Sequence, residues 1–198
     1  MKKFFLSVFI LIIFILLQSC SKKYEVIRNV SKFNYSIIDH NYNTKIFYKD
    51  FAGKNLLFTM FFLNCPDICP MTANNLRNVY EEAKKKNLKN FNILMLSFDS
   101  ERDNPDKLKE FSDLTGIDFP NFLFAWAPKA TVDSIKNAFK YVAETAGDTA
   151  YSPSGEPIYF YVHTDKIYLI DKNGNWIKDY SGSEANIEEI VDDLKILE

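Results

Sequence analysis

Two cysteines four residues apart are the residues of this chain best suited to chemistry. Cys65 and Cys69 lie in the segment NCPDICP, residues 64–70, where a buried strand is expected to end and a helix to begin. Backbone N–H groups and the dipole at a helix start stabilise a thiolate. The spacing puts both side chains on one helical face with Cβ atoms about 5–6 Å apart, whereas a relaxed disulfide prefers about 3.8 Å. The pair therefore suits metal chelation better than a disulfide.

Other states of the two thiols stay open. Oxidation requires the loop half of the motif to shift, and Pro66 with its flanking turn could permit that shift. A purely structural disulfide would close a loop too small to stabilise the fold much. Two inert buried thiols are the remaining alternative.

Only two histidines are available as further ligands. His163 ends an aromatic β-prone run and follows a long loop that could let it swing toward the cysteines. His40 lies in a predicted turn, where we expect it to be solvated. Two soft thiolates and one imidazole favour Cu(I) but also accept Cu(II) or Zn(II), so the donor set alone does not select copper.

Acidic residues follow the second predicted strand. Asp99 lies at the carboxyl end of this strand, where open α/β sheets hold functional groups, so we expect it to support the site or to dock a partner. Asp103 is expected to cap the following helix, with Arg102 as its partner or in a surface ion pair. Asp67, between the two cysteines, is either an exposed acid at the helix start or a partner contact.

The elements that must position these residues alternate between strands and helices. Continuous apolar runs predict strands buried on both faces, and apolar residues at helical spacing predict the helices between them. We expect strands at residues 55–63, 91–98, 158–162, 166–171 and 176–180, and helices at 69–86, 105–114, 128–143 and 184–197. Residues 144–157 predict a loop, and β-prone runs at 35–39 and 44–48 predict an added N-terminal hairpin. This order predicts a thioredoxin-like α/β sandwich.

Composition limits the function classes. The chain has 198 residues, of which 47% are hydrophobic and 25% charged, with a net charge of −2. Collagen-like and disordered classes are excluded, and one globular domain is expected. The acids and bases are interspersed, so no nucleic-acid surface is indicated.

The N-terminal residues predict an export signal. A basic head and an apolar stretch at residues 4–17 precede the sequence LQSC, which ends at Cys20 and resembles the cleavage box of bacterial lipoproteins. The stretch is shorter than the roughly twenty residues of a spanning helix. We therefore expect a signal peptide at 1–20 with lipidated Cys20, a tether at 21–36 and a domain at 37–198. An uncleaved anchor is the alternative, and either places the domain in the cell envelope, facing the periplasm or the outside.

Three motifs in this order resemble the Sco/SenC copper proteins. They are FFLNCPDICP at 61–70, SFDSERDNP at 97–105, and His163 ahead of YLID at 168–171 and Gly174. The resemblance covers about residues 51–197. It implies a thioredoxin-like fold, copper held by the thiolates of Cys65 and Cys69 and the imidazole of His163, and delivery of copper to the binuclear copper centre of cytochrome c oxidase.

The chain departs from the family pattern at three places. Val162 stands where an acid usually precedes the histidine, and Ser100 stands where Pro usually follows the first Asp of the acidic motif. Leu63 and Asn64 stand before the first cysteine, where the family usually has a polar pair that includes Thr.

The resemblance also implies an alternative function, a thiol-disulfide oxidoreductase that keeps the cysteines of the oxidase copper site reduced. Cys65 or Cys69 would then be the catalytic nucleophile and the other would resolve the mixed disulfide, with no need for a histidine. A peroxidase would need a Thr and Arg arrangement around one cysteine of low pKa, which the motif does not show. The expected partners are the copper-centre subunit of the oxidase and, through the lipid anchor, a membrane.

Overall fold

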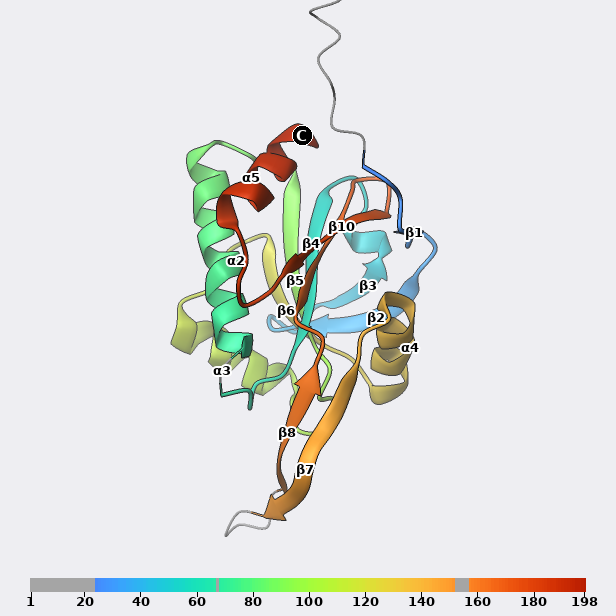
Figure 1. Ribbon diagram of the computed structural model, residues 1–198, viewed down its shortest axis with the longest axis vertical. Helices are drawn as coiled ribbons and strands as arrows, with labels where there is room; N and C mark the ends of the chain where they lie inside the picture. Colours follow the sequence, from blue (N-terminus) through green and yellow to red (C-terminus); the bar gives the residue numbers. More distant parts are fainter. Residues whose placement is uncertain (1–23, 67, 152–156) are drawn as a thin grey trace, which may run out of the picture.

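A long mixed β-sheet forms the centre of the computed structural model, which describes residues 24–66, 68–151 and 157–198 (Figure 1). Within these residues the main sheet has eight strands in the order β1-β10-β9-β4-β5-β6-β2-β3, and β7 and β8 form a separate two-stranded ribbon. The strands are β1 (Arg28–Asn29), β2 (Asn34–Asp39), β3 (Thr44–Tyr48), β4 (Asn55–Phe61), β5 (Phe91–Ser97), β6 (Phe122–Trp126), β7 (Ala143–Tyr151), β8 (Pro157–His163), β9 (Lys166–Ile170) and β10 (Asn175–Ser181). The helices are the short 3-10 helix η1 (Lys49–Phe51), α2 (Ile68–Lys85), α3 (Pro105–Thr115), α4 (Lys129–Phe139) and α5 (Ile187–Ile196).

Three parallel strands make the middle of the sheet. β4 pairs with β5 and β5 with β6, each in parallel. All seven residues of β4 are buried, as the continuous apolar run predicts for a strand covered on both faces. Figure 1 shows α2, α3 and α5 on one face and α4 on the other. The predicted thioredoxin-like α/β sandwich is confirmed.

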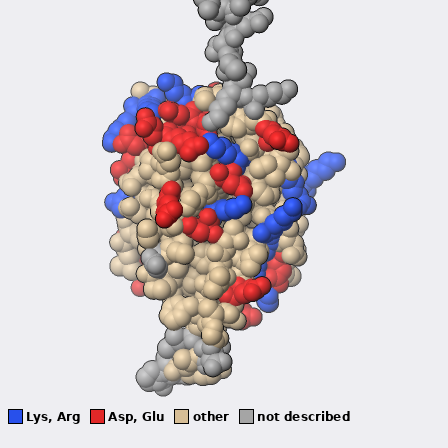
Figure 2. Space-filling model, viewed as in Figure 1, with Lys and Arg blue, Asp and Glu red and all other residues tan. Residues whose placement is uncertain are grey.

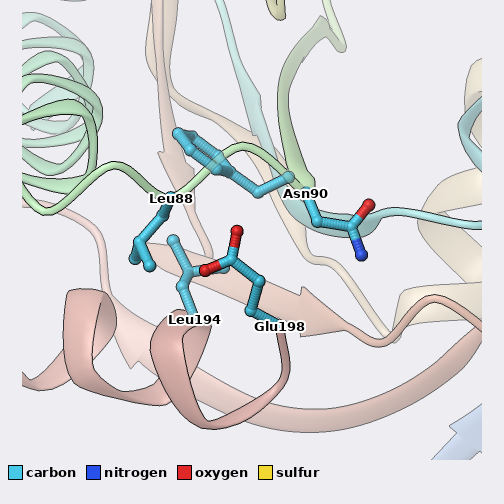
Figure 3. A pocket seen from close by; sticks show the side chains of 5 residues that line it. Leu88, Asn90, Leu194 and Glu198 are labelled. Carbon is cyan, nitrogen blue, oxygen red and sulfur yellow. The ribbon is translucent and has the colours of Figure 1, made fainter.

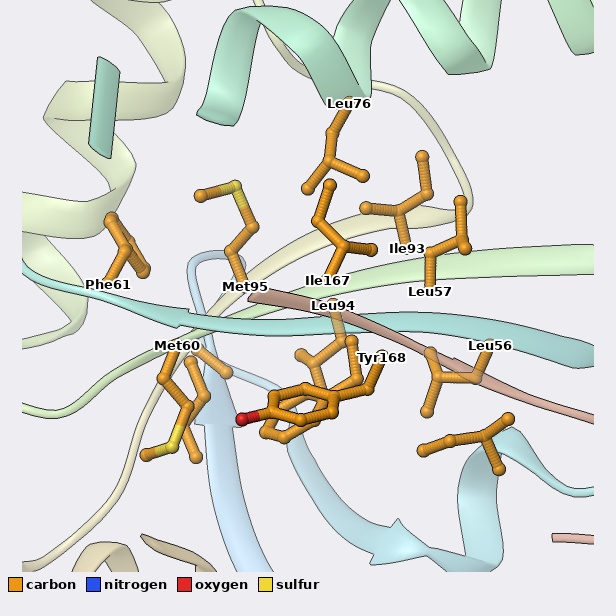
Figure 4. Packing of buried hydrophobic residues seen from close by; sticks show 14 of the residues in the cluster. Leu56, Leu57, Met60, Phe61, Leu76, Ile93, Leu94, Met95, Ile167 and Tyr168 are labelled. Atoms are coloured by element: carbon orange, nitrogen blue, oxygen red, sulfur yellow. The ribbon is translucent and has the colours of Figure 1, made fainter. Parts of the chain in front are cut away.

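Successive residues of the central strands pack on opposite faces of the sheet. Leu57 and Ile93 point toward Leu76 of α2, whereas Leu56 and Tyr168 point to the other side (Figure 4). All five are fully buried. Burial of one such aliphatic side chain contributes about 1.5–3 kcal/mol, so the sheet is a rigid platform for the loops at its edges.

The added N-terminal hairpin is also confirmed, and regular structure begins earlier in the chain than predicted. β2 pairs with β3 in antiparallel register around a turn at residues 40–43. β1 lies inside the tether expected at 21–36, pairs with β10, and is followed by the fully buried Val30. The sheet therefore reaches back to Arg28. In the part of the chain that the structure describes, no helix has both the length and the apolar character needed to cross a membrane.

The prediction of a loop at residues 144–157 is wrong, because the strand β7 occupies much of this segment. β7 pairs with β8 in antiparallel register from Ala143 opposite His163 to Tyr151 opposite Pro157. This ribbon projects from the body (Figure 1), so its sequence lacks the apolar alternation that marks a strand lying on a core. The strand β6 was also missed, and the helix predicted to reach residue 143 ends at Phe139.

The other end of the parallel strands is closed by the end of α5. Leu194 and Glu198 lie beside Leu88 and Asn90 (Figure 3). The Glu198 carboxylate accepts a hydrogen bond from the Lys89 N–H at 3.0 Å. The opposite end of the parallel strands, where β4 and β5 have their carboxyl ends, is the edge at which the cysteine motif begins.

Asp103 connects the carboxyl ends of β4 and β5. Its carboxylate accepts hydrogen bonds from the Ser97 hydroxyl at 2.6 Å and from the Leu63 N–H at 3.1 Å, just before the cysteine motif. The helix cap expected from Asp103 is supplied by Asn104, whose side chain accepts from the Lys107 N–H at 2.9 Å. Burial raises the pKa of Asp103 to about 6.

We expect Asp103→Asn to gain stability relative to the wild type as the pH rises. Folding raises the pKa of this carboxyl from 3.8 to about 6, so its contribution to stability is full below pH 4 and is lost as the pH rises through 6. Between pH 4 and pH 7.5 the unfolding free energy of the variant should rise by about 1–3 kcal/mol relative to that of the wild type. Urea unfolding at both pH values measures it.

The matched control for this prediction is Asn104→Ala. It removes a neighbouring cap that carries no titrating group, and we expect a loss of about 1 kcal/mol that does not change with pH. A pH-independent difference between Asp103→Asn and the wild type would contradict the prediction.

Candidate metal centre

The two cysteines flank the start of α2. Cys65 lies in the loop after β4, and Cys69 lies in the first turn of α2. The expectation that both lie on one helical face is therefore wrong, because the helix begins only at Ile68. The Cys69 N–H donates to the Cys65 sulfur at 3.3 Å. Cys65 thus satisfies a free N–H of the first helical turn, the task of a capping side chain.

His163 comes to the cysteines from the end of the ribbon. β9 runs antiparallel to β4, so the residues before β9 lie at the same edge of the sheet as the residues after β4. The Nε2 atom of His163 lies 3.8 Å from the Cys69 sulfur. One ligand atom from each of Cys65, Cys69 and His163 lies within 4.8 Å of the others. The structure therefore brings together the three residues predicted as ligands.

Aromatic rings surround the imidazole. The ring centroids of Phe62 and Phe98 lie 5.8 and 5.3 Å from that of His163. Tyr141 lies nearly parallel to the imidazole, and its hydroxyl is 2.9 Å from Nδ1. Both cysteines are buried and His163 is half-buried, so the site is open on the histidine side.

The proton of the Cys69 thiol is held firmly in this arrangement. The hydrogen bond to Cys65 and then burial raise the pKa of Cys69 well above its usual range. The sequence predicted a stabilised thiolate at the helix start, and for Cys69 that expectation is wrong because a second sulfur lies beside it. Burial lowers the pKa of His163, but its contacts with Cys65 and the Thr164 carbonyl outweigh burial, and the net change is upward. A cation bound between the two sulfurs would lower the pKa of Cys69 and let both sulfurs be thiolates.

Asp99 lies behind the aromatic rings. Its carboxylate pairs with the guanidinium of Arg102, and both side chains are buried. The Tyr161 hydroxyl approaches the other carboxylate oxygen at 3.5 Å. Arg102 donates to the Tyr159 carbonyl at 3.0 Å and lies 3.7 Å from the centre of the Tyr159 ring. Asp99 therefore contacts the ribbon strand that ends in His163, directly at Tyr161 and through Arg102 at Tyr159. Arg102 pairs with Asp99 and not with Asp103.

Three residues near the cluster were not predicted from the sequence. Tyr141 and the Thr164 carbonyl contact His163 Nδ1. Asp165 accepts hydrogen bonds from the Ser183 N–H, and its charge contributes to the raised pKa of Cys69 and of His163. Asp165 could have been noticed as the acid nearest His163 in sequence, whereas no local pattern marks Tyr141.

The remaining predicted residues do not join the cluster. His40 is fully buried, not solvated, and its Nδ1 accepts a hydrogen bond from the Phe124 N–H at 3.2 Å. The position that precedes the histidine holds Val162, which is 68% exposed. Cys20 and Asp67 lie outside the described residues.

The surface beside His163 is apolar. Val142, just before the ribbon, and Phe160 and Val162 on the ribbon are all about half exposed or more. Figure 2 shows Lys, Arg, Asp and Glu spread over the body of the molecule, while the described atoms just below the body are mainly tan. A partner that approaches the histidine side of the site therefore meets exposed apolar side chains, with the exposed Glu144 opposite Val162.

Two sulfurs and one imidazole nitrogen define the chemistry of the cluster. Thiolate ligands suit Cu(I) and Zn(II), and imidazole suits copper and zinc alike. The two thiols can also form a disulfide, since neither cysteine is in a disulfide here. The arrangement thus supports metal binding and thiol-disulfide exchange.

Comparison with known protein sequences finds a matching family and related proteins. The SCO1/SenC family model matches residues 28–197. An SCO1 protein homolog of Bacillus subtilis is 27% identical over 146 residues, which are 72% of this chain and 70% of that protein. An SCO2-like protein of Rickettsia felis is 29% identical over 164 residues, which are 82% of this chain and 74% of that protein.

Solved structures share the fold. A SCO1/SenC family lipoprotein from Bacillus anthracis has a TM-score of 0.71 at 24% identity, over 85% of this chain and 95% of that one. Bradyrhizobium japonicum ScoI with copper bound has a TM-score of 0.70 at 23% identity, over 83% of this chain and 98% of that one. With the family model spanning nearly the whole described chain, this protein belongs to the SCO1/SenC family.

Proposed function

We propose that this protein binds one copper ion through Cys65, Cys69 and His163 and delivers it to the copper centre of cytochrome c oxidase during assembly. The convergence of the three donor atoms within 4.8 Å carries the proposal. Relatives of the same fold support the choice of metal and client. ScoI and yeast Sco1 have been solved with copper bound, and another neighbour is described as a member of a family of cytochrome c oxidase assembly proteins.

The site suits a cargo that must be held and then released. The charge of Cu(I) offsets the repulsion between two neighbouring thiolates, so metal binding and deprotonation of Cys69 occur together. The sulfurs of Cys65 and Cys69 are buried, while His163 is half-buried. A thiolate of the client can replace His163 first and the two cysteines afterwards, so copper passes by ligand exchange with no turnover.

We expect the reduced protein without residues 1–20 to bind one equivalent of Cu(I) tightly. Cys65→Ser and Cys69→Ser should each abolish tight binding, and His163→Ala should weaken it about 10–100-fold, because each removes one donor from the cluster. Titration against a competing Cu(I) chelator measures this.

Met71→Ala is the matched control for the titration. It removes a thioether that is 46% exposed and lies two residues from Cys69, so its affinity should equal that of the wild type. Weak, nonstoichiometric binding by the wild type that does not depend on His163 would refute the copper proposal.

We also expect the Cu(I) affinity to rise with pH. The pKa of Cys69 is raised by its hydrogen bond to Cys65 and by burial, so the Cys69 thiol keeps its proton near neutral pH in the metal-free protein. Binding should release at least the proton of Cys69, and the logarithm of the association constant should rise by about one or more per pH unit. Competition titrations at pH 6.5 and 7.5, with an indicator for released protons, test this. A slope near zero would show that the thiolates exist before the metal arrives.

The second candidate function is thiol-disulfide exchange by the same cysteines. One solved neighbour, 23% identical, is described as having a disulfide switch. When Cys65 and Cys69 form a disulfide, they give up two electrons and two protons, which reduce a disulfide of the partner to two thiols. His163 takes no part in this exchange. Retained exchange in His163→Ala, together with weak copper binding by the wild type, would favour this function.

We infer further that Cys20 anchors the protein to a membrane of the cell envelope. The LQSC sequence supports this, as does the description of the Bacillus anthracis relative as a lipoprotein. Cys20→Ser should move the protein from the membrane fraction and stop its labelling by a fatty acid, whereas Cys65→Ser should leave both unchanged. Unlabelled wild type that stays with the membrane would instead indicate an uncleaved anchor.

A further inference from the structure

The hydroxyl of Tyr141 lies between two groups of different kinds. It is 3.1 Å from the Met60 carbonyl oxygen and 2.9 Å from Nδ1 of His163. A phenol carries one proton and can also accept. Because the Met60 carbonyl can only accept, the hydroxyl donates to Met60 and accepts from His163.

A second contact leads to the same protonation state. The Thr164 carbonyl oxygen lies 3.0 Å from His163 Nδ1. A bare Nδ1 would direct its lone pair at this oxygen, whereas an Nδ1–H can donate to it. Both neighbours of Nδ1 therefore favour a proton on that nitrogen, and the tautomer follows from the contacts around it.

The other ring nitrogen faces the cysteines. Nε2 lies 3.8 Å from the Cys69 sulfur, and the imidazole also contacts Cys65. A thiol can donate to a bare Nε2 as well as accept from an Nε2–H, so neither sulfur requires a proton on Nε2. With the proton on Nδ1, the lone pair of Nε2 is directed toward the space between the thiols. This is the form of imidazole that binds a metal.

Tyr141 is firmly placed for this task. It follows α4, and its N–H donates to the Lys136 carbonyl at 2.8 Å. Its side chain is buried, and its ring also packs on Phe98. The hydroxyl thus connects β4, through Met60, to the histidine on the projecting ribbon.

We propose that Tyr141 is a positioning residue that holds the His163 imidazole with its proton on Nδ1 and Nε2 free, so that the third ligand is in place before the metal arrives. This proposal rests on the proposed function only for the identification of the metal as copper. Partners of this kind around a ligating histidine fix its tautomer and orientation, and their loss typically costs 10–100-fold in metal affinity.

The direct test uses nitrogen-15 NMR of the metal-free, reduced protein at a pH where His163 is neutral. We expect a protonated-type Nδ1 signal and a pyridine-type Nε2 signal in the wild type. In Tyr141→Phe, which keeps the ring and removes only the hydroxyl, the two signals should move toward the average of two exchanging tautomers. Wild-type protein with its proton on Nε2, or an unchanged pattern in Tyr141→Phe, would overturn the proposal.

Tyr168→Phe is the matched control. Tyr168 is also a buried tyrosine beside β4, but among the described residues its hydroxyl has no hydrogen-bond partner. We expect its loss to leave the His163 signals unchanged. An equal change in both variants would mean that any lost buried hydroxyl disturbs the site, and would refute a specific role for Tyr141.

A copper titration then tests the consequence for the ligand. Tyr141→Phe should lower the Cu(I) affinity about tenfold, and adding His163→Ala should remove any further effect of the tyrosine. If the wild type binds no copper but shows the expected tautomer, the proposed function fails and the role of Tyr141 stands. If copper binds tightly but Tyr141→Phe changes neither tautomer nor affinity, the role of Tyr141 fails alone.

Discussion

The antiparallel pairing of β9 with β4 is the constraint on which the site depends. Leu56 lies opposite Ile170 and Phe58 opposite Tyr168, and the Thr59 hydroxyl donates to the Lys166 carbonyl at 2.8 Å. This register puts the start of β9 at the edge where β4 ends. Residues 94 positions apart, Cys69 and His163, therefore meet. A shift of one residue would turn every buried side chain of β9 to the other face, so packing of the core and assembly of the site are secured by the same register.

Buried polar groups then fix the segments that leave this edge. Asp103 holds the Leu63 N–H before the cysteine motif, and Arg102, paired with Asp99, holds the Tyr159 carbonyl of the ribbon. Removing one member of a buried ion pair typically costs about 3–5 kcal/mol, because the other charge stays buried without its partner. Both segments are thus positioned by the protein itself, and the metal need not organise them.

Much of this arrangement could be predicted from local sequence, and the parts that could not depend on contacts between distant residues. The apolar run of β4 and the helix after it were predicted within one or two residues, since both follow from strand and helix periodicity. Asp103 and Asn104 are both suitable caps, and only the distant Leu63 N–H explains why Asn104 has that role. β7 was missed because a ribbon that leaves the body buries no face, and the role proposed for Tyr141 depends on a histidine 22 residues away. His163 itself was assigned by resemblance to a family, since no pattern along the chain links it to the cysteines.

The ligands come from two separate sheets, with the cysteines following the main sheet and the histidine ending the ribbon. The three ligands would therefore act together only while the ribbon is held against the main sheet, and Arg102 and Tyr141 both contact residues of each. Substitutions at the contacts that hold the ribbon should accordingly change both how long copper is retained and the free energy of unfolding.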